Sequence, residues 1–284
     1  RLVKSLTLAI ASTGVLLLSA ATQALALELN FDKQIGEPGF APGQLAAPQG
    51  IEVQKETGDI FVSNGRRLDR VEVYDSEGNY IKSIGSTGSG PGQFDEPSTL
   101  AFDPDNGNLY VGDVYNNRIN VFDADGNFLR SFAEGDFGGL KPGRLFFGPS
   151  GMTFDKEGNL YVGDFSNDKI NVYNKEGKLI KTIGSSGTEP GQFQGPAGVR
   201  ISPVSGKIYV TDQFNNRVEV LDCEGNPLLV FGEQGTGPGQ FNQPIGVELD
   251  EQENIYVADS INSRVQVFDK DGNFLTQYGK PALN

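Results

Sequence analysis

The chain has 284 residues and a formal net charge of −14, from 37 acidic and 23 basic side chains, with no histidine and one cysteine. The absence of histidine excludes catalysis, metal binding and pH sensing through imidazole, and a single cysteine excludes a disulfide within the chain. A chain this acidic is repelled by phosphate backbones, which argues against nucleic acid as a partner.

The first 26 residues are typical of a secretory signal peptide. Arg1 and Lys4 give a basic start, residues 6–18 are mostly apolar, and residues 24–26 (Ala-Leu-Ala) offer a cleavage site. A membrane anchor is the alternative, but the apolar run is shorter than the ~20 residues that a spanning helix needs. We therefore expect a secreted or periplasmic mature protein from residue 27 onward, with 21 basic and 37 acidic residues and no membrane insertion after signal cleavage.

The rest of the chain repeats one segment five times, and the copies begin near residues 48, 97, 149, 196 and 244. Each copy contains four short alternating runs, which in the third copy are residues 151–154, 159–163, 169–173 and 178–183. The turns between the runs are too short for parallel crossovers, so the four strands form an antiparallel meander. Repeats of this length with four strands are typical of propeller blades. We predict an all-β propeller of four-stranded antiparallel blades over residues 27–284.

Residues 30–47 precede the first copy and align without gaps on residues 79–96, so they repeat only the outer strand of a blade and the loop that leaves it, here called the exit loop. In propellers such a leading strand completes the last blade and closes the ring. The fifth copy already has its own outer strand, at residues 274–278. We therefore expect part of a six-bladed protein, with five complete blades and the closing strand. The alternative is a five-bladed ring in which residues 31–35 add a fifth strand or fray.

Four copies share a charged pattern where the second strand ends. An Asp ends the strand, an Asn follows three residues later, and a basic residue follows five residues later. The pairs are Asp113 with Arg118, Asp164 with Lys169, Asp212 with Arg217, and Asp259 with Arg264. Such an Asp can cap the turn while the Arg bridges to it in two-pronged geometry, so the pairs are predicted to be structural. The alternative is a ring of carboxylates that could hold a cation such as Ca²⁺.

The segments DVYNNRINVF, DQFNNRVEVL and DSINSRVQVF resemble the repeats of the NHL family, in which a strand ending in Asp leads through an Asn-His-Arg-like turn into an apolar strand. The His of the family is replaced by Asn117, Asp168, Asn216 and Ser263, and the first copy has Asn64 in place of the Asp. The resemblance implies a propeller scaffold for interactions. NHL-type amidating lyases rely on histidine ligands and disulfides, so this chain cannot copy their chemistry. The RNA-binding mode of some NHL domains conflicts with the charge and the expected export.

The G-P-G-Q-F segments, at residues 90–94 and 237–241 with variants elsewhere, do not form phosphate-binding loops, since no Gly-Lys-Ser/Thr follows them. We expect them to carry the chain from one blade to the next, with Phe94, Phe193 and Phe241 inserted between blades.

Ligand-binding residues are expected where the copies differ. One polar position in the first strand faces the central channel by alternation, and it holds Glu52, Thr153, Arg200 and Glu248 in four copies. Exposed residues in the turns after the second strands are candidate contacts for a peptide or sugar: Arg66, Tyr115, Phe165 and Phe214. The second exit loop is four residues longer, within residues 135–147, and could overhang the channel.

These features predict a non-catalytic scaffold without a cofactor, which binds a protein or a small extracellular ligand on its loop face. The alternative is a Ca²⁺-dependent enzyme of lactonase or lyase type at the central channel. Its metal ligands would include Glu52 and Glu248, because Ca²⁺ prefers oxygen ligands. If Arg200 lay between these two glutamates, it would neutralise them and no cation would be needed.

Overall fold

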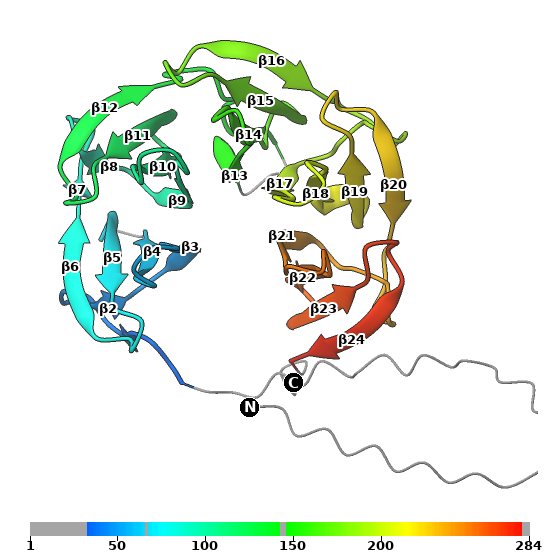
Figure 1. Ribbon diagram of the computed structural model, residues 1–284, viewed down its shortest axis with the longest axis horizontal. Helices are drawn as coiled ribbons and strands as arrows, with labels where there is room; N and C mark the ends of the chain where they lie inside the picture. The colour runs from blue at the N-terminus through cyan, green and yellow to red at the C-terminus, as the bar shows by residue number, and fades with distance from the viewer. Residues whose placement is uncertain (1–32, 66–67, 143–145, 280–284) are drawn as a thin grey trace, which may run out of the picture.

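The computed structural model describes residues 33–65, 68–142 and 146–279, which form an all-β propeller (Figure 1). Five four-stranded antiparallel sheets follow one another around a single axis as blades 1 to 5, in chain order. Blade 1 comprises β3 (Pro48–Val53), β4 (Ile60–Asn64), β5 (Arg70–Tyr74) and β6 (Tyr80–Ile84). Blade 2 comprises β9 (Pro97–Phe102), β10 (Leu109–Asp113), β11 (Arg118–Phe122) and β12 (Phe128–Phe132).

The last three blades repeat this pattern. Blade 3 comprises β13 (Pro149–Phe154), β14 (Leu160–Asp164), β15 (Lys169–Tyr173) and β16 (Leu179–Ile183). Blade 4 comprises β17 (Pro196–Ile201), β18 (Ile208–Asp212), β19 (Arg217–Leu221) and β20 (Pro227–Phe231). Blade 5 comprises β21 (Pro244–Leu249), β22 (Ile255–Asp259), β23 (Arg264–Phe268) and β24 (Phe274–Tyr278).

The first strand of each blade lies nearest the axis and the fourth lies on the outer rim (Figure 1). The two middle strands are almost entirely buried, because alternate side chains of each sheet pack against the neighbouring blades, two in blades 2 to 4 and one in blades 1 and 5 among the described residues. The core consists of four apolar clusters, one between each pair of successive blades. Helix is confined, in the described ranges, to the short 3₁₀ turn η1 (Gln213–Asn215), and none of these residues form a helix long and apolar enough to cross a membrane.

Three exit loops insert a phenylalanine between blades. Phe94, Phe193 and Phe241 are fully buried. Short parallel strand pairs hold two of the equivalent loops: β1 (Glu37–Pro38) with β2 (Gln44–Leu45), and β7 (Ser86–Thr87) with β8 (Gln93–Phe94). The G-P-G-Q-F sequence is therefore a device for packing successive blades.

The exit loop of blade 2 also inserts a phenylalanine between blades, but from a different position in the loop. Phe137 is buried in the cluster between blades 2 and 3, only five residues after β12 ends. The backbone N–H of Gly138 then donates to Asp164, as the N–H of Asp95 donates to Asp113 in the preceding blade. The added length of this loop therefore lies after Phe137, between the inserted ring and the start of β13.

Residues 33–47 occupy the place of an exit loop that enters blade 1. Lys33 donates to the carbonyl of Ser76, just as Lys82 donates to Ala124 one blade later. Ile35 lies against Gly78, as Ile84 lies against Gly126. Of the expected closing strand, residues 31 and 32 lie outside the described residues, and residues 33–35 are not in a strand. A strand requires a hydrogen-bonded neighbour, and no described strand pairs with these three residues.

Blades 1 and 5 flank the open side of the ring (Figure 1). Ile51 and Val53 of β3 are 64% and 51% exposed, whereas Leu100 and Met152, at the position of Ile51 in blades 2 and 3, are at most 3% exposed. Exposed apolar side chains at a position that is otherwise buried indicate a blade face without a packed neighbour among the described residues.

We predict that the inserted phenylalanines dominate the stability of the blade interfaces. Phe241→Ala should lower the free energy of unfolding by about 3–5 kcal/mol, because it opens a cavity between blades 4 and 5. Phe40→Ala is the matched control, since Phe40 lies in an exit loop but is 69% exposed, and its effect should stay within about 0.5 kcal/mol. Urea denaturation followed by circular dichroism measures both. Equal losses in the two variants would contradict this account.

Candidate functional site

The basic residue five positions after each strand-ending Asp lies beside that Asp. The Arg Nε donates to the carboxylate at 3.0 Å in Asp113–Arg118, 3.0 Å in Asp212–Arg217 and 2.8 Å in Asp259–Arg264. Lys169 approaches Asp164 less closely, with Nζ 3.9 Å from Oδ2. The side chains of all four aspartates are inaccessible to solvent.

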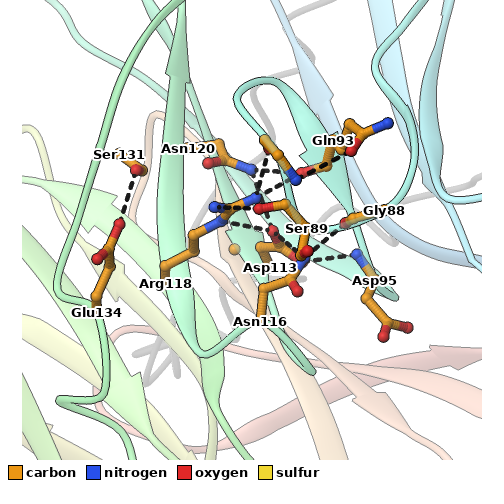
Figure 2. Close-up of polar contacts among 12 residues, drawn as sticks. Gly88, Ser89, Gln93, Asp95, Asp113, Asn116, Arg118, Asn120, Ser131 and Glu134 are labelled. Carbon is orange, nitrogen blue, oxygen red and sulfur yellow. Dashed lines mark hydrogen bonds and ion pairs between the residues drawn. The ribbon is translucent and has the colours of Figure 1, made fainter.

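Figure 2 shows what these pairs do in blade 2. The guanidinium of Arg118 holds Asp113 and also donates to the carbonyls of Gly90 and Gln93 in the preceding exit loop, at 3.0 and 2.9 Å. The other oxygen of Asp113 accepts from the backbone N–H of Asp95 at 2.8 Å. The pair therefore joins the blade to its entering loop.

The electrostatics of these aspartates fit the same role. Burial raises the pKa of Asp113, Asp164 and Asp212, although hydrogen bonds from neighbouring amides and the adjacent basic residue oppose the shift. Their oxygens already accept hydrogen bonds from the protein. A cation such as Ca²⁺, which takes 6–8 oxygen ligands, would have to displace those bonds.

The position before each basic residue has a structural role that sequence reasoning missed. Asp168 and Asn216 have φ of 58° and 53°, in the left-handed region that Asp and Asn tolerate best among non-glycine residues. Each accepts the backbone N–H that precedes the next blade, from Gly195 at 2.8 Å and from Gln243 at 2.9 Å. The run of Asn and Asp at this position was the available signal.

Arg200 lies between the two glutamates on the axis. Its Nη2 donates to Glu52 of blade 1 at 2.7 Å and its Nε donates to Glu248 of blade 5 at 2.6 Å. Its Nη1 reaches the carbonyl of Met152 in blade 3 at 3.3 Å. Burial raises the pKa of Glu52 above its usual value, and Arg200 opposes that shift. One guanidinium thus links four blades and neutralises part of the acidic charge.

No cluster of three or more acidic or cysteine side chains that could hold a metal ion occurs among the residues that the structure describes. Thr153, the fourth predicted axial residue, is buried, and its hydroxyl accepts from the N–H of Ile201 at 3.4 Å. The three charged axial residues therefore bind one another, and Thr153 binds the backbone of the neighbouring blade.

The strand register separates the predicted ligand residues into two groups. Glu52 pairs with Phe61, near the turn between β3 and β4, while Pro48 at the other end of β3 pairs with Asn64. Four residues of strand span about 13 Å. The axial charges thus lie near the face formed by the turns between the first and second strands and between the third and fourth strands of each blade, here called the turn face. The aromatic residues lie at the opposite end, on the loop face, which is formed by the turns after the second strands and the exit loops.

Aromatic side chains form a row on the loop face across blades 2 to 4. Ring centroids are 5.0 Å apart for Tyr115 and Phe147, 6.3 Å for Phe146 and Phe165, and 5.8 Å for Phe165 and Phe214, all edge to face. Tyr115 and Phe146 are 56% and 53% exposed, and Phe214 is half-buried. The prediction that Phe165 is exposed was wrong: it is 2% exposed, because the long exit loop and Phe214 cover it.

The long exit loop supplies the residues of this row that the sequence did not single out. Phe146 and Phe147 belong to its added length, and Leu140 in the same loop is 62% exposed. Two adjacent aromatic residues in the one lengthened exit loop were a usable signal. Arg66, the remaining candidate, lies outside the described residues.

The turn face carries most of the negative charge. Its ten turns, between the first and second and the third and fourth strands of each blade, contain 18 acidic and 6 basic residues. Asp75 and Asp123 are typical of these turns, since the carboxylate of each accepts hydrogen bonds from the backbone N–H groups two and four residues later. A hydrogen bond from the side chain of the following Asn, together with these backbone bonds, lowers the pKa of each Asp. The turn face thus repels anions, while the loop face presents exposed apolar rings.

Comparisons with known proteins agree with this architecture. The sequence matches the family described as "6-bladed beta-propeller" over residues 30–137 and 197–277. It also matches the family described as "SMP-30/Gluconolactonase/LRE-like region" over residues 85–192. A search of curated proteins gave no match.

Solved structures with the same fold share little sequence with this chain. A nidogen/laminin complex aligns with a TM-score of 0.64 and 17% identity, covering 84% of this chain and 82% of the other. Virginiamycin B lyase from Staphylococcus aureus, in a catalytically inactive form with quinupristin, aligns with a TM-score of 0.59 and 15% identity, covering 84% and 71%. A Bacteroides caccae protein of unknown function gives 0.61 and 16%, covering 82% and 81%. Identities this low establish the fold alone.

We predict that Arg200→Gln destabilises the protein by about 1–3 kcal/mol at pH 7, because it leaves the mostly buried Glu52 carboxylate without its cation. The pKa of Glu52 should then rise further. At pH values between the usual pKa of 4.5 and this raised pKa, the folded state binds more protons than the unfolded state. The variant therefore regains stability as the pH falls through this range.

Urea denaturation at pH 7 and at pH 5 measures this effect. The deficit of the variant should shrink at pH 5. In the background of Glu52→Gln, which removes the titrating group, the same Arg200→Gln change should lose most of this pH dependence. A deficit of equal size at both pH values in the Glu52 background would contradict the assignment.

Proposed function

Because this chain belongs to the 6-bladed beta-propeller family, we propose that it is an exported propeller of NHL type that binds a protein, peptide or sugar on its loop face. The observation that carries the proposal is the aromatic row of blades 2 to 4. The exposed rings of Tyr115 and Phe146 offer apolar contact surface beside the half-buried Phe214, and the tyrosine hydroxyl adds a polar contact.

The row is a departure from the repeat, which supports a role in binding. Blades 1 and 5 have no aromatic residue at the position of Tyr115 and Phe214, where blade 5 carries Ile261. In blade 3 the same position is Ser166, which is buried under the long exit loop. The long exit loop supplies an exposed aromatic ring over blade 3 instead, that of Phe146. A scaffold needs no such asymmetry, whereas a ligand that crosses three blades does.

The expected export fits this role. The basic and apolar start of the sequence directs secretion, and the acidic turn face keeps the protein soluble. Because the turn face repels anionic molecules, the loop face is the surface on which we expect the ligand to bind. The ligand is therefore an extracytoplasmic molecule with apolar or ring-shaped groups, such as an aromatic peptide segment or a sugar.

An enzyme of lactonase or lyase type is the second candidate, and the match to the gluconolactonase-like region over residues 85–192 is the observation that favours it. Its cation would need carboxylates on the axis. Arg200 already pairs with Glu52 and Glu248, so a cation would have to displace a guanidinium bound at 2.7 and 2.6 Å. This competition makes binding the better supported function.

We predict that exposed rings of the loop face determine ligand affinity. The full chain is first tested on arrays of peptides and oligosaccharides, and the ligand retained is titrated by calorimetry. Tyr115→Ala and Phe146→Ala should each weaken its binding at least about tenfold, as expected for an aromatic contact residue. Val204→Ala is the matched control, because Val204 is 60% exposed but lies on the turn face. Equal affinities of all three variants would reject the loop face as the binding site.

We predict that calcium does not bind on the axis. Calorimetric titration with calcium chloride up to about 1 mM, a range that covers weak extracellular calcium sites, should release no binding heat. Binding heat that the double variant Glu52→Gln, Glu248→Gln abolishes would instead favour the enzyme.

A further inference from the structure

The outer strand of blade 4 differs from the other four outer strands in its side chains. β20 reads Pro-Leu-Leu-Val-Phe and contains no polar residue. Each of the others has two adjacent polar residues in its second half, which are Lys-Ser, Arg-Ser, Lys-Thr and Thr-Gln. Charged side chains on the strand at the edge of a sheet oppose pairing with a strand of another molecule. β20 lacks that protection.

The charged residue of the other outer strands holds the next blade. Lys82, Arg130 and Lys181 each donate to backbone carbonyls in the next turn along the rim, at distances between 2.8 and 3.3 Å. Leu229 occupies this position in β20, and its side chain lies against Gly272 in the corresponding turn of blade 5. Packing between blades therefore accounts for Leu229.

The other side of β20 is not explained in this way. Leu229 and Phe231 pack on the cluster between blades 4 and 5. Leu228 and Val230 point to the opposite side, because successive side chains of a strand alternate. Leu228 is 54% exposed and Val230 is half-buried. The strand thus presents an apolar side chain to solvent next to a second one that is only partly covered.

The backbone of β20 offers a place for a further strand. β20 is the last strand of its sheet and lies on the rim of the propeller, so one of its edges has no strand beside it among the described residues (Figure 1). Alternate residues of such an edge direct their N–H and C=O groups outwards, ready to pair with an added strand. Pro227 has no N–H, so this pairing is confined to residues 228–231.

The flanks of the strand are acidic. Residues 222–233 contain three acidic residues and no basic one: Asp222, Glu224 and Glu233. The turn that Leu229 contacts adds Asp269, Lys270 and Asp271, and Lys181 of blade 3 donates to the carbonyl of Cys223 at 3.1 Å. These segments together carry five acidic and two basic residues. A second copy of the chain would bring like charges together at this edge, whereas a basic segment would be attracted to it.

We propose that the outer edge of β20 binds an extended basic segment of a partner protein as a fifth strand of blade 4. The segment has apolar residues in its middle, which pack on Leu228 and Val230, and Lys or Arg at both ends, which meet the acidic flanks. Hydrogen bonds between main chains supply the affinity of such strand addition, and the side chains supply the specificity. This surface lies on the rim and is separate from the loop face.

The proposal is tested with a synthetic strand. A fluorescein-labelled peptide of sequence KKVYVYVKK is titrated with the full chain, and its anisotropy is followed. We expect saturable binding with a Kd below about 1 mM. A peptide with proline in place of the central valine keeps the charge but loses the N–H and the extended pairing, and it should bind at least about tenfold more weakly. A peptide with glutamate in place of the four lysines should be weakened by at least about tenfold as well.

A protein variant locates the site. Leu228→Lys should weaken binding of the basic peptide at least about tenfold, because a lysine on the edge opposes pairing and repels the peptide. Ile180→Lys is the matched control, since Ile180 has the same position in β16 and is 51% exposed. It should leave the affinity unaltered. Circular dichroism checks that both variants fold.

Three results would overturn the proposal. The first is equal binding of the valine and proline peptides, or no binding up to about 1 mM, and it requires only the unaltered protein. The second is an equal effect of the two lysine substitutions, because the peptide would then bind elsewhere. The third is self-association of the chain that Leu228→Lys abolishes and that excludes the peptide, which would assign the edge to a second copy.

Discussion

Every blade of this protein depends on its neighbours to bury its apolar side chains. A four-stranded sheet has two faces, and in blades 2 to 4 both faces are buried because a blade packs on each side, while blades 1 and 5 each pack on one neighbouring blade among the described residues. The exit-loop phenylalanines complete this packing, and the Asp–Arg pairs fix the loops that carry them. Stability thus resides between blades, as in other repeat proteins in which each unit contacts its neighbours.

This dependence explains where function can reside. Residues repeated in most of the blades already have structural partners. Asp113, for example, accepts from Arg118, Asn116 and a backbone N–H, and no oxygen is left free for a ligand. Departures from the repeat are free of this constraint. The longest segment that departs from the repeat is the second exit loop. Its Phe137 enters the blade interface soon after β12 ends, and its added residues then lie on the loop face.

Much of the fold could be predicted from the sequence, because alternation and turn chemistry are local. The strand bounds of blade 3 differ from the expected ones by at most two residues. Alternation also placed Arg200, Glu52 and Glu248 on the axis. It could not show that they lie about 13 Å along the strand from the loop face, because period 2 specifies the side of a sheet on which a residue lies and says nothing of depth.

The errors at the site have a common physical cause. Phe165 was expected to be exposed from its position in a turn, but its exposure depends on a loop of the preceding blade. The sequence also could not tell which phenylalanine of that loop enters the core. Phe137 and Phe146 are both apolar and near Gly residues, and only the packing against blade 3 assigns one to the interior and the other to the surface.

Charge and aromatic surface occupy opposite ends of the propeller, and this separation has consequences for association. The turn face repels anionic surfaces over about one Debye length, ~8 Å at physiological ionic strength. The Arg200 pairs lie at that end and hold the axial carboxylates in place. At the loop-face site proposed above, the affinity of a ligand would come from contact with rings such as Tyr115 and Phe146. Binding of that kind should depend weakly on salt and strongly on shape, because apolar contact, unlike charge attraction, is not screened by ions.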